Sequence, residues 1–232
     1  SAGKKFGTSN TLVGKKINLE FVSANPTGPL HLGHTRWAAV GDSLGRVLAA
    51  AGAQVSREFY VNDRGNQMDL FGASIRAAAL GKARPEDGYH GEYIEDLAKE
   101  IVKSNPQITQ LAESESISAF TQAGYKLQLE QQRKVLDNFG THFDTWFSER
   151  SLYEDNFFNH SLDKLKKEGH VFEQEGAIWL RTTDFGDDKD RVMIKSDGTF
   201  AYFASDSAYY VSKRERGFNL CIYMLGADHH GY

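Results

Sequence analysis

The order of strand-like and helix-like segments near the start of the chain constrains its fold most. Residues 17–24 are typical of a short strand, and the loop 25–29, with two prolines and a glycine, interrupts it. Apolar residues then recur at helical spacing from Gly33 to Ala51; they are Trp37, Val40, Leu44, Val47, Leu48 and Ala51. A second strand is expected at 54–61 and a second helix at 66–80. Strand, long helix and strand in this order predict a βαβ unit, the start of a parallel sheet.

The rest of the chain predicts a helical block followed by shorter strands. We expect helices at 93–104, 115–139, 157–169 and 206–215, and strands at 143–147, 171–182, 191–203 and 219–225. The turn Ser196-Asp197-Gly198 is expected to close a hairpin. The last strand is apolar throughout, which is typical of a parallel sheet. The pattern favours an α/β fold, a doubly wound parallel sheet with a largely helical insertion.

Composition and charge exclude several classes of protein. A net charge of −4 excludes a generally basic nucleic-acid-binding surface, so any RNA contact must use a local patch or another domain. No apolar run approaches the roughly 20 residues that span a bilayer, and the N-terminal residues lack a signal peptide's apolar stretch. The single cysteine, Cys221, cannot form an internal disulfide. Together these features favour a cytoplasmic protein without membrane association. Because Cys221 lies in an apolar run, we interpret it as a packing residue.

The segment His31-Leu32-Gly33-His34 lies between the first expected strand and the N-terminus of the following helix. Ligands bind at this edge of a doubly wound sheet, where free backbone N–H groups and the helix dipole favour phosphate. Gly33 lets a flat base or a phosphate approach closely. The two imidazoles can donate hydrogen bonds to phosphoryl oxygens as negative charge develops there. The segment therefore predicts a nucleotide-binding loop.

Two other interpretations of His31 and His34 remain. The pair could cap the helix as satisfied histidines. It could also bind a metal together with His229, His230 or Asp228, although no Glu separates the two histidines as in the zinc-protease motif.

Three sequence blocks resemble bacterial arginyl-tRNA synthetases, a family of class I aminoacyl-tRNA synthetases. They are residues 20–36 around His-Leu-Gly-His, Tyr60-Val61-Asn62-Asp63-Arg64-Gly65-Asn66-Gln67, and Gly226-Ala227-Asp228-His229-His230-Gly231-Tyr232. A lone His-x-Gly-His is a weak signal. Here the three blocks follow expected strands in order, and the resemblance extends from about Ile17 to Tyr232. It implies the Rossmann-like nucleotide-binding fold of class I synthetases.

The resemblance also implies a set of site residues, with His31 and His34 as the catalytic pair. The residues that it assigns to ATP are Thr27, Gly28, His31, Gly33, His34, Gly226 and Asp228. Those that it assigns to arginine are Glu20, Ser23, Asn25, Tyr202, Asp206 and His229. Within this set Asp206 would pair with the guanidinium fork, whose N–H donors match a carboxylate in a way that a lysine ammonium does not. Glu20 and Asn25 would contact the backbone groups of the amino acid, and no side chain is assigned to a metal.

Local chemistry offers simpler interpretations for several of these positions. Asp206 could be the N-cap of a helix, and Glu20 could lie in water at the end of its strand. A buried Glu20 would need a partner, because both faces of a parallel sheet are covered. Asp63 and Asn66 are interpreted as a turn and a helix start. Lys195 is interpreted as a hairpin residue and not as part of the family's lysine-serine phosphate loop, which is expected downstream of this chain.

The resemblance implies a reaction in two steps. The arginine carboxylate attacks the α-phosphorus of ATP and releases pyrophosphate, and the arginyl group then passes to tRNA(Arg). The resemblance also implies that the first step needs bound tRNA. We therefore expect as ligands arginine, ATP with Mg²⁺, and tRNA(Arg), which would be bound mainly by domains absent from this chain. We expect a monomer that is inactive or weak by itself. A nucleotidyltransferase of the same superfamily and a non-catalytic nucleotide-binding module remain alternatives.

The expected organisation has four parts. Residues 1–16 form a flexible lead-in and residues 17–81 the first half of the catalytic domain. Residues 82–190 form a mostly helical insertion with a few strands. Residues 191–232 form the second half of the catalytic domain, which ends before the phosphate-binding loop.

Overall fold

The fold comes from a computed structural model that describes residue 3, residues 6–154 and residues 157–226, apart from the side chain of Tyr202. Contacts within the chain divide it into two compact units. The first unit comprises Ser1–Glu20, Gly45–Ser56 and Ser148–Tyr232, and the second comprises Phe21–Leu44 and Arg57–Phe147. None of the helices in the described part of the chain has both the length and the apolar character that a membrane span requires.

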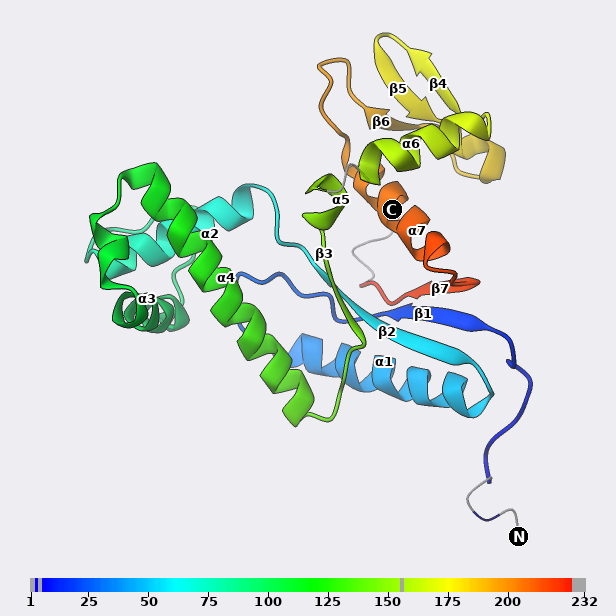
Figure 1. The fold of residues 1–232 in the computed structure, drawn as a ribbon, viewed down its shortest axis with the longest axis horizontal. Helices are drawn as coiled ribbons and strands as arrows, with labels where there is room; N and C mark the ends of the chain where they lie inside the picture. Colours follow the sequence, from blue (N-terminus) through cyan, green and yellow to red (C-terminus); the bar gives the residue numbers. More distant parts are fainter. Residues whose placement is uncertain (1–2, 4–5, 155–156, 227–232) are drawn as a thin grey trace. The chain divides into compact units, whose positions relative to one another are not determined.

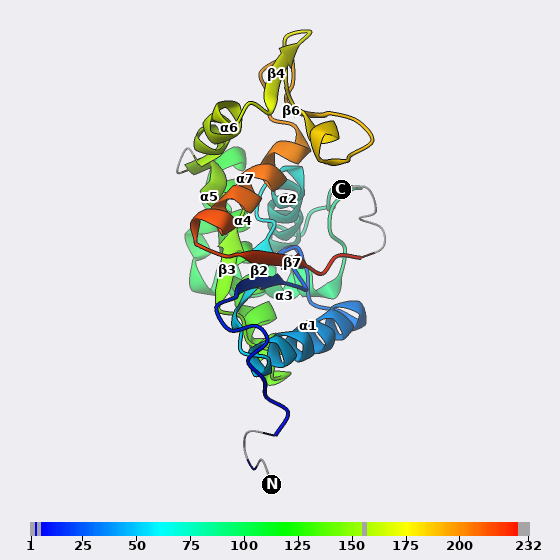
Figure 2. The ribbon, with the colours of Figure 1, turned by 90° about the vertical axis from the view of Figure 1, so that its right-hand side faces the viewer.

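The main sheet confirms the expected α/β fold. Its strands are β1 (Lys16–Glu20), β2 (Gln54–Val61), β3 (Thr145–Ser148) and β7 (Leu220–Tyr223), in the order β3-β2-β1-β7. Within the first unit β1 and β7 lie side by side (Figure 2). They run parallel, with Ile17 opposite Leu220 and Glu20 opposite Tyr223. Helix α1 (Leu32–Ala50) follows β1 and precedes β2, as the βαβ pattern predicted.

Strand β1 is shorter than expected, because the chain leaves the sheet after Glu20. Val22 and Ser23 have φ angles of 68° and 45°, a left-handed conformation that is costly for a β-branched residue such as Val22. The Ser23 hydroxyl accepts a hydrogen bond from the backbone N–H of Tyr60 at 3.1 Å, which holds this bend in place. The predicted strand 17–24 is therefore wrong beyond Glu20.

Helix α1 agrees with the expected range to within one residue at each end. The apolar spacing that indicated the helix does not mark its buried face, however, because Val40 and Val47 are 51% and 65% exposed. Ala38 and Gly41 are buried instead. A methyl group added at Gly41 would collide with the ring of Phe21, so this part of α1 packs through small residues that allow close approach.

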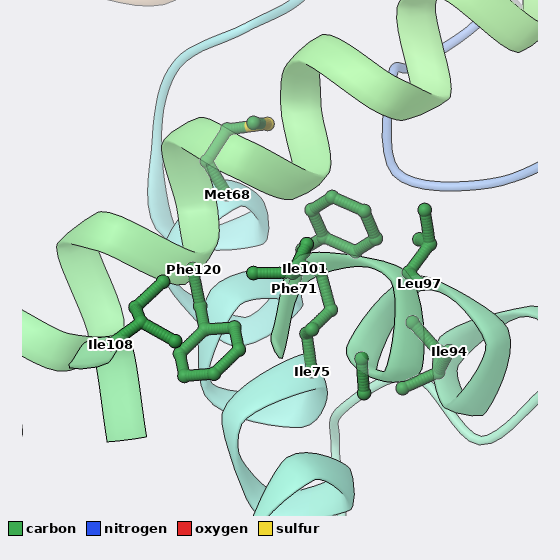
Figure 3. Packing of buried hydrophobic residues seen from close by; sticks show 9 residues of the cluster. Met68, Phe71, Ile75, Ile94, Leu97, Ile101, Ile108 and Phe120 are labelled. Carbon is green, nitrogen blue, oxygen red and sulfur yellow. The ribbon is translucent and has the colours of Figure 1, made fainter. Parts of the chain in front are cut away.

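The second unit contains the longest run of consecutive helices in the described part of the chain. They are α2 (Asn66–Ala79), α3 (Glu92–Ser104), the short 3-10 helix η2 (Pro106–Gln110) and α4 (Glu113–Asn138), and the three α-helices begin and end close to the predicted residues. Their shared core consists of Met68, Phe71, Ile75, Ile94, Leu97, Ala98, Ile101, Ile108 and Phe120 (Figure 3). Each large apolar side chain of this core contributes roughly 1.5–3 kcal/mol by leaving water.

The first unit holds a smaller sheet with helices beside it. Strands β4 (Val171–Gln174), β5 (Ala177–Leu180) and β6 (Arg191–Ile194) are antiparallel in the order β4-β5-β6. Three helices of this unit, α5 (Ser151–Glu154), α6 (Phe157–Lys167) and α7 (Tyr202–Glu215), and the 3-10 helix η3 (Thr182–Phe185) complete it. Helix α6 packs against β4 and α7 against β6 (Figure 1).

Two strand predictions in this region are wrong. Residues 171–182 form a hairpin and not one strand, because Glu175 and Gly176 have φ angles of 53° and 75° and make a tight turn between β4 and β5. The strand expected at 191–203 ends at Ile194, and only an isolated bridge joins Ile194 to Phe200 across the turn at 196–198. The helix expected from Asp206 begins at Tyr202.

Candidate active site

The side chains of the two histidines in the His-Leu-Gly-His segment form hydrogen bonds at the N-terminus of helix α1. His31 precedes the first helical residue, and its Nδ1 accepts a hydrogen bond from the backbone N–H of Gly33 at 3.1 Å. The Nδ1 of His34 in turn accepts from the backbone N–H of His31 at 3.1 Å. The two rings lie 3.8 Å apart between centroids. Each histidine therefore satisfies an N–H group that the helix itself leaves unpaired, in the manner of a reciprocal capping box.

This capping arrangement has a chemical consequence. An imidazole whose Nδ1 accepts a hydrogen bond carries its proton on Nε2 when it is neutral. Burial, and to a smaller degree the charge of His31, lower the pKa of His34 below its ordinary value of 6.5. His34 is therefore neutral at neutral pH and presents an Nε2–H donor. The capping interpretation agrees with the geometry, and it is compatible with hydrogen bonding to a phosphoryl oxygen.

The loop before this helix start is held from helices α3 and α4. The hydroxyl of Tyr93 donates to the carbonyl of Thr27 at 2.9 Å. The side-chain amide of Gln132 donates to the carbonyls of Asn25 and Gly28, each at 2.9 Å. Tyr93 and Gln132 were not among the predicted site residues, because a tyrosine and a glutamine on polar helices carry no sequence signal for a distant backbone partner.

In the first unit, Glu20 is buried at the end of β1 and has partners within the chain. Its Oε2 accepts hydrogen bonds from the Lys213 ammonium at 2.6 Å and from the Tyr209 hydroxyl at 2.8 Å. Lys213 is fully buried and also lies over the rings of Tyr209 and Tyr223, at 4.2 and 3.7 Å from their centroids. The interpretation of Glu20 as a residue in water is therefore wrong. Its contact with arginine remains a prediction.

Sequence reasoning missed Lys213 and Tyr209 on helix α7. The prediction that a buried Glu20 needs a partner is confirmed, and the partner that the structure shows is the Lys213 ammonium of the same chain. Tyr209 and Lys213 lie one helical turn apart, so they share a face of α7. That spacing is also typical of an exposed helix, and only the burial of both residues shows its meaning.

The two residues predicted to contact the guanidinium, Tyr202 and Asp206, lie in the first turns of α7. Ala201 occupies the N-cap position and Tyr202 begins the helix, so Asp206 lies one turn inside it. The interpretation of Asp206 as an N-cap is therefore wrong. The contact of Tyr202 and Asp206 with a guanidinium remains a prediction. Asp206 is exposed.

The remaining predicted positions divide into described and undescribed ones. Gly226 directly follows the chain segment after β7 and is partly buried. Asp228 and His229, and the His230 of the metal-binding interpretation, lie outside the described residues. Helix α2 begins at Asn66, and Lys195 accepts and donates backbone bonds in the turn at 195–199, as the local chemistry indicated.

The chain matches one protein family over nearly its whole length. Residues 2–232 match the family model described as class I tRNA synthetases (R), catalytic domain. The chain belongs to the class I arginyl-tRNA synthetase family. Named arginine–tRNA ligases are 54% identical in Renibacterium salmoninarum and 51% identical in Paenarthrobacter aurescens, each over 231 residues and 100% of this chain. The chain spans 42% of the length of both relatives.

Solved structures of arginyl-tRNA synthetases share the fold. A protein assigned to this family from Campylobacter jejuni is 39% identical, with a TM-score of 0.88, over 100% of this chain and 52% of its own. The Thermus thermophilus arginyl-tRNA synthetase is 23% identical, with a TM-score of 0.63, over 89% of this chain and 37% of its own. The latter comparison shows the fold alone. Together they confirm the Rossmann-like α/β class that the arginyl-tRNA synthetase resemblance implied.

Proposed function

We propose that this chain is the core of an arginine–tRNA ligase that activates arginine with ATP and transfers it to tRNA(Arg). The observation that carries the proposal is the helix start of α1, where Nδ1 of His34 accepts from the backbone N–H of His31 and Nδ1 of His31 accepts from that of Gly33. This arrangement leaves an Nε2–H on each neutral ring as a hydrogen-bond donor. It occurs in a chain that belongs to the arginyl-tRNA synthetase family.

The first step is the attack of the arginine carboxylate oxygen on the α-phosphorus of ATP. The new P–O bond forms as the bond to the pyrophosphate oxygen breaks, so no protein nucleophile is required. The chain supplies position and charge stabilisation. His31 and His34 would donate to the phosphoryl oxygens on which negative charge grows. In the second step a terminal ribose hydroxyl of tRNA attacks the arginyl carbonyl and releases AMP.

We assign the ligand contacts as the resemblance indicates. Those for ATP, which is expected to carry Mg²⁺ on its phosphates, are Thr27, Gly28, His31, Gly33, His34, Gly226 and Asp228. Those for arginine are Glu20, Ser23, Asn25, Tyr202, Asp206 and His229. The Glu20 carboxylate is already paired with Lys213 and Tyr209, so its assignment to arginine rests on the resemblance.

The wider properties of the protein are part of the same proposal. We expect a cytoplasmic monomer in which tRNA(Arg) is bound mainly by regions outside residues 1–232, since the chain spans 42% of its relatives' length. The division into a lead-in (1–16), two catalytic halves (17–81 and 191–232) and an insertion (82–190) also stays a proposal. Residues 1–232 alone are expected to charge tRNA poorly or not at all.

Calorimetric titration with arginine, lysine and citrulline, each with and without ATP, tests this function. Citrulline keeps the shape of arginine and loses its charge, whereas lysine keeps a charge without the fork. A site built to pair a guanidinium should reject both by roughly 10²-fold or more. Equal affinity for citrulline and arginine would contradict the proposal. Binding of pantetheine-like or nicotinate-like compounds in place of arginine would instead indicate a nucleotidyltransferase.

A further inference from the structure

The backbone between β1 and α1 is held in place by two side chains of the neighbouring helices. Residues 21–31 form neither helix nor strand, so the regular hydrogen bonds of secondary structure do not hold them. Gln132 and Tyr93 instead donate to three of their carbonyls, those of Asn25, Thr27 and Gly28. All of these residues belong to the second unit, so the contacts lie within one compact body.

Gln132 is suited to a positioning role because it is buried and its geometry is constrained. Its side chain is 1% exposed, and its Nε2 reaches the Asn25 and Gly28 carbonyls at once. A two-fold donor of this kind fixes the spacing of the two carbonyls. Its Oε1 is buried without a hydrogen-bond partner among the described residues, a state that costs free energy. The same holds for Oε1 of Gln128 on this helix, so Gln132 is distinguished by its two hydrogen bonds to the loop.

Tyr93 holds the loop at the carbonyl between those two. Burial, with a smaller contribution from Tyr89, raises the pKa of its hydroxyl to about 12, so the group remains a donor at neutral pH. The same hydroxyl limits the space at Gly28, where an added methyl group would lie 3.4 Å from it. Such a methyl group would make an ordinary van der Waals contact, so Tyr93 lies beside the loop at Gly28.

We propose that Gln132 and Tyr93 are positioning residues for adenylate formation. They hold the backbone of Asn25, Thr27 and Gly28 in the conformation in which this loop receives ATP and arginine. The inference rests on the proposed function, which assigns substrate contacts to these loop residues. Preorganisation of this kind raises the rate, because a misplacement of about 1 Å at the reacting groups can cost roughly 10²-fold.

The chain offers a matched control for each of these residues. Gln128 lies one turn before Gln132 on α4, is also fully buried, and donates to Gln131 on its own helix at 3.3 Å. Tyr89 lies near Tyr93 and packs its ring edge-on against Phe71. The control for Gln132→Met is therefore Gln128→Met, which also removes a buried amide. The control for Tyr93→Phe is Tyr89→Phe, which also removes a phenol hydroxyl. Neither control removes a hydrogen bond to the loop.

The test is arginine-dependent exchange of pyrophosphate into ATP in the presence of tRNA(Arg). It is measured for the wild type and these four variants in the protein at its full natural length. We expect Gln132→Met to lower kcat/KM for ATP by about tenfold and Tyr93→Phe by about threefold, since each loses hydrogen bonds to the loop. The two control variants should stay within about twofold of the wild type. Urea unfolding, measured in parallel, separates these effects from a loss of stability.

A second readout does not depend on catalysis. Amide hydrogen exchange of residues 21–31 should become faster in Gln132→Met and Tyr93→Phe and stay unchanged in the two controls. The inference is overturned if Gln132→Met changes neither the rate of pyrophosphate exchange nor the amide hydrogen exchange of the loop more than Gln128→Met does. Absence of pyrophosphate exchange in the wild type would overturn the proposed function, and the hydrogen-exchange comparison would still decide whether the two side chains order the loop.

Discussion

The Lys213 ammonium lies 2.6 Å from Oε2 of Glu20, although Glu20 ends a strand and Lys213 lies in a helix 193 positions later. Glu20 is 6% exposed and Lys213 is 0% exposed. A buried charge of either sign is unfavourable unless it is paired, so each residue requires the other. This pair joins the end of β1 to α7 within the first unit.

Removal of one partner should destabilise the first unit strongly. We expect Lys213→Met to lower the free energy of unfolding by about 3–5 kcal/mol, because it leaves the Glu20 carboxylate buried without its cation. The double variant Glu20→Leu with Lys213→Met should recover part of this loss, since an apolar pair has no charge to desolvate. Urea unfolding of both variants measures the difference. A double variant at least as unstable as Lys213→Met would contradict this account.

The charge of Asp206 should control the affinity for arginine. We expect Asp206→Asn to raise KM for arginine by roughly 10²-fold, because an amide replaces the carboxylate that would pair with the guanidinium. KM for ATP should change little. Glu215→Gln is the matched control, since it removes a carboxylate from the far end of the same helix, where Glu215 pairs with His160. Equal effects of the two substitutions on KM for arginine would exclude the assigned role of Asp206.

His34 should titrate below its ordinary pKa of 6.5, because burial disfavours its charged form. As the pH falls below 6.5, the unfolded chain binds this proton first, so the contribution of His34 lowers stability progressively in that range. Proton NMR of the imidazole signals measures the midpoint. His31→Asn should raise it but leave it below 6.5, because burial is the larger cause and asparagine preserves a helix cap. A midpoint at or above 6.5 in the wild type would contradict the geometry.

The close crossing of α2 and α4 should not tolerate a larger residue at Gly72. An added methyl group would collide with the Thr121 hydroxyl and lie 2.8 Å from the carbonyl oxygen of Ile117. We expect Gly72→Ala to destabilise by about 1–3 kcal/mol, although alanine favours helix more than glycine does. Combination with Thr121→Ala should relieve part of the cost, as two residues in contact are not additive. Thermal unfolding of the single and double variants is the measurement.

Sequence patterns predicted the regular elements of this chain well and its special backbone positions poorly. The expected strand at 54–61 coincides with β2. The errors at Ser23 and Glu175 arise where residues other than glycine adopt positive φ angles, which tertiary contacts and not local preference decide. A left-handed Val22 has no sequence signature at all.

The candidate site was predictable where its chemistry is local. His31, Gly33 and His34 lie together in sequence, so their spacing predicted the helix start that the structure shows, and phosphate binding there stays a prediction. Gln132 and Lys213 could not be found in this way, because each acts on a residue more than a hundred positions away. A glutamine or a lysine on a polar helix looks like a solvent-exposed residue until its burial is known.

Arginine-dependent pyrophosphate exchange of the wild type and of His34→Ala, at full natural length and with tRNA(Arg) present, tests the central claim most directly. The claim is that the histidines at the start of α1 stabilise charge on the phosphoryl group during adenylate formation. We expect His34→Ala to slow the exchange by roughly 10²–10³-fold, the cost of one lost preorganised donor, while the affinity for arginine is largely kept. An unchanged exchange rate in His34→Ala would contradict the claim.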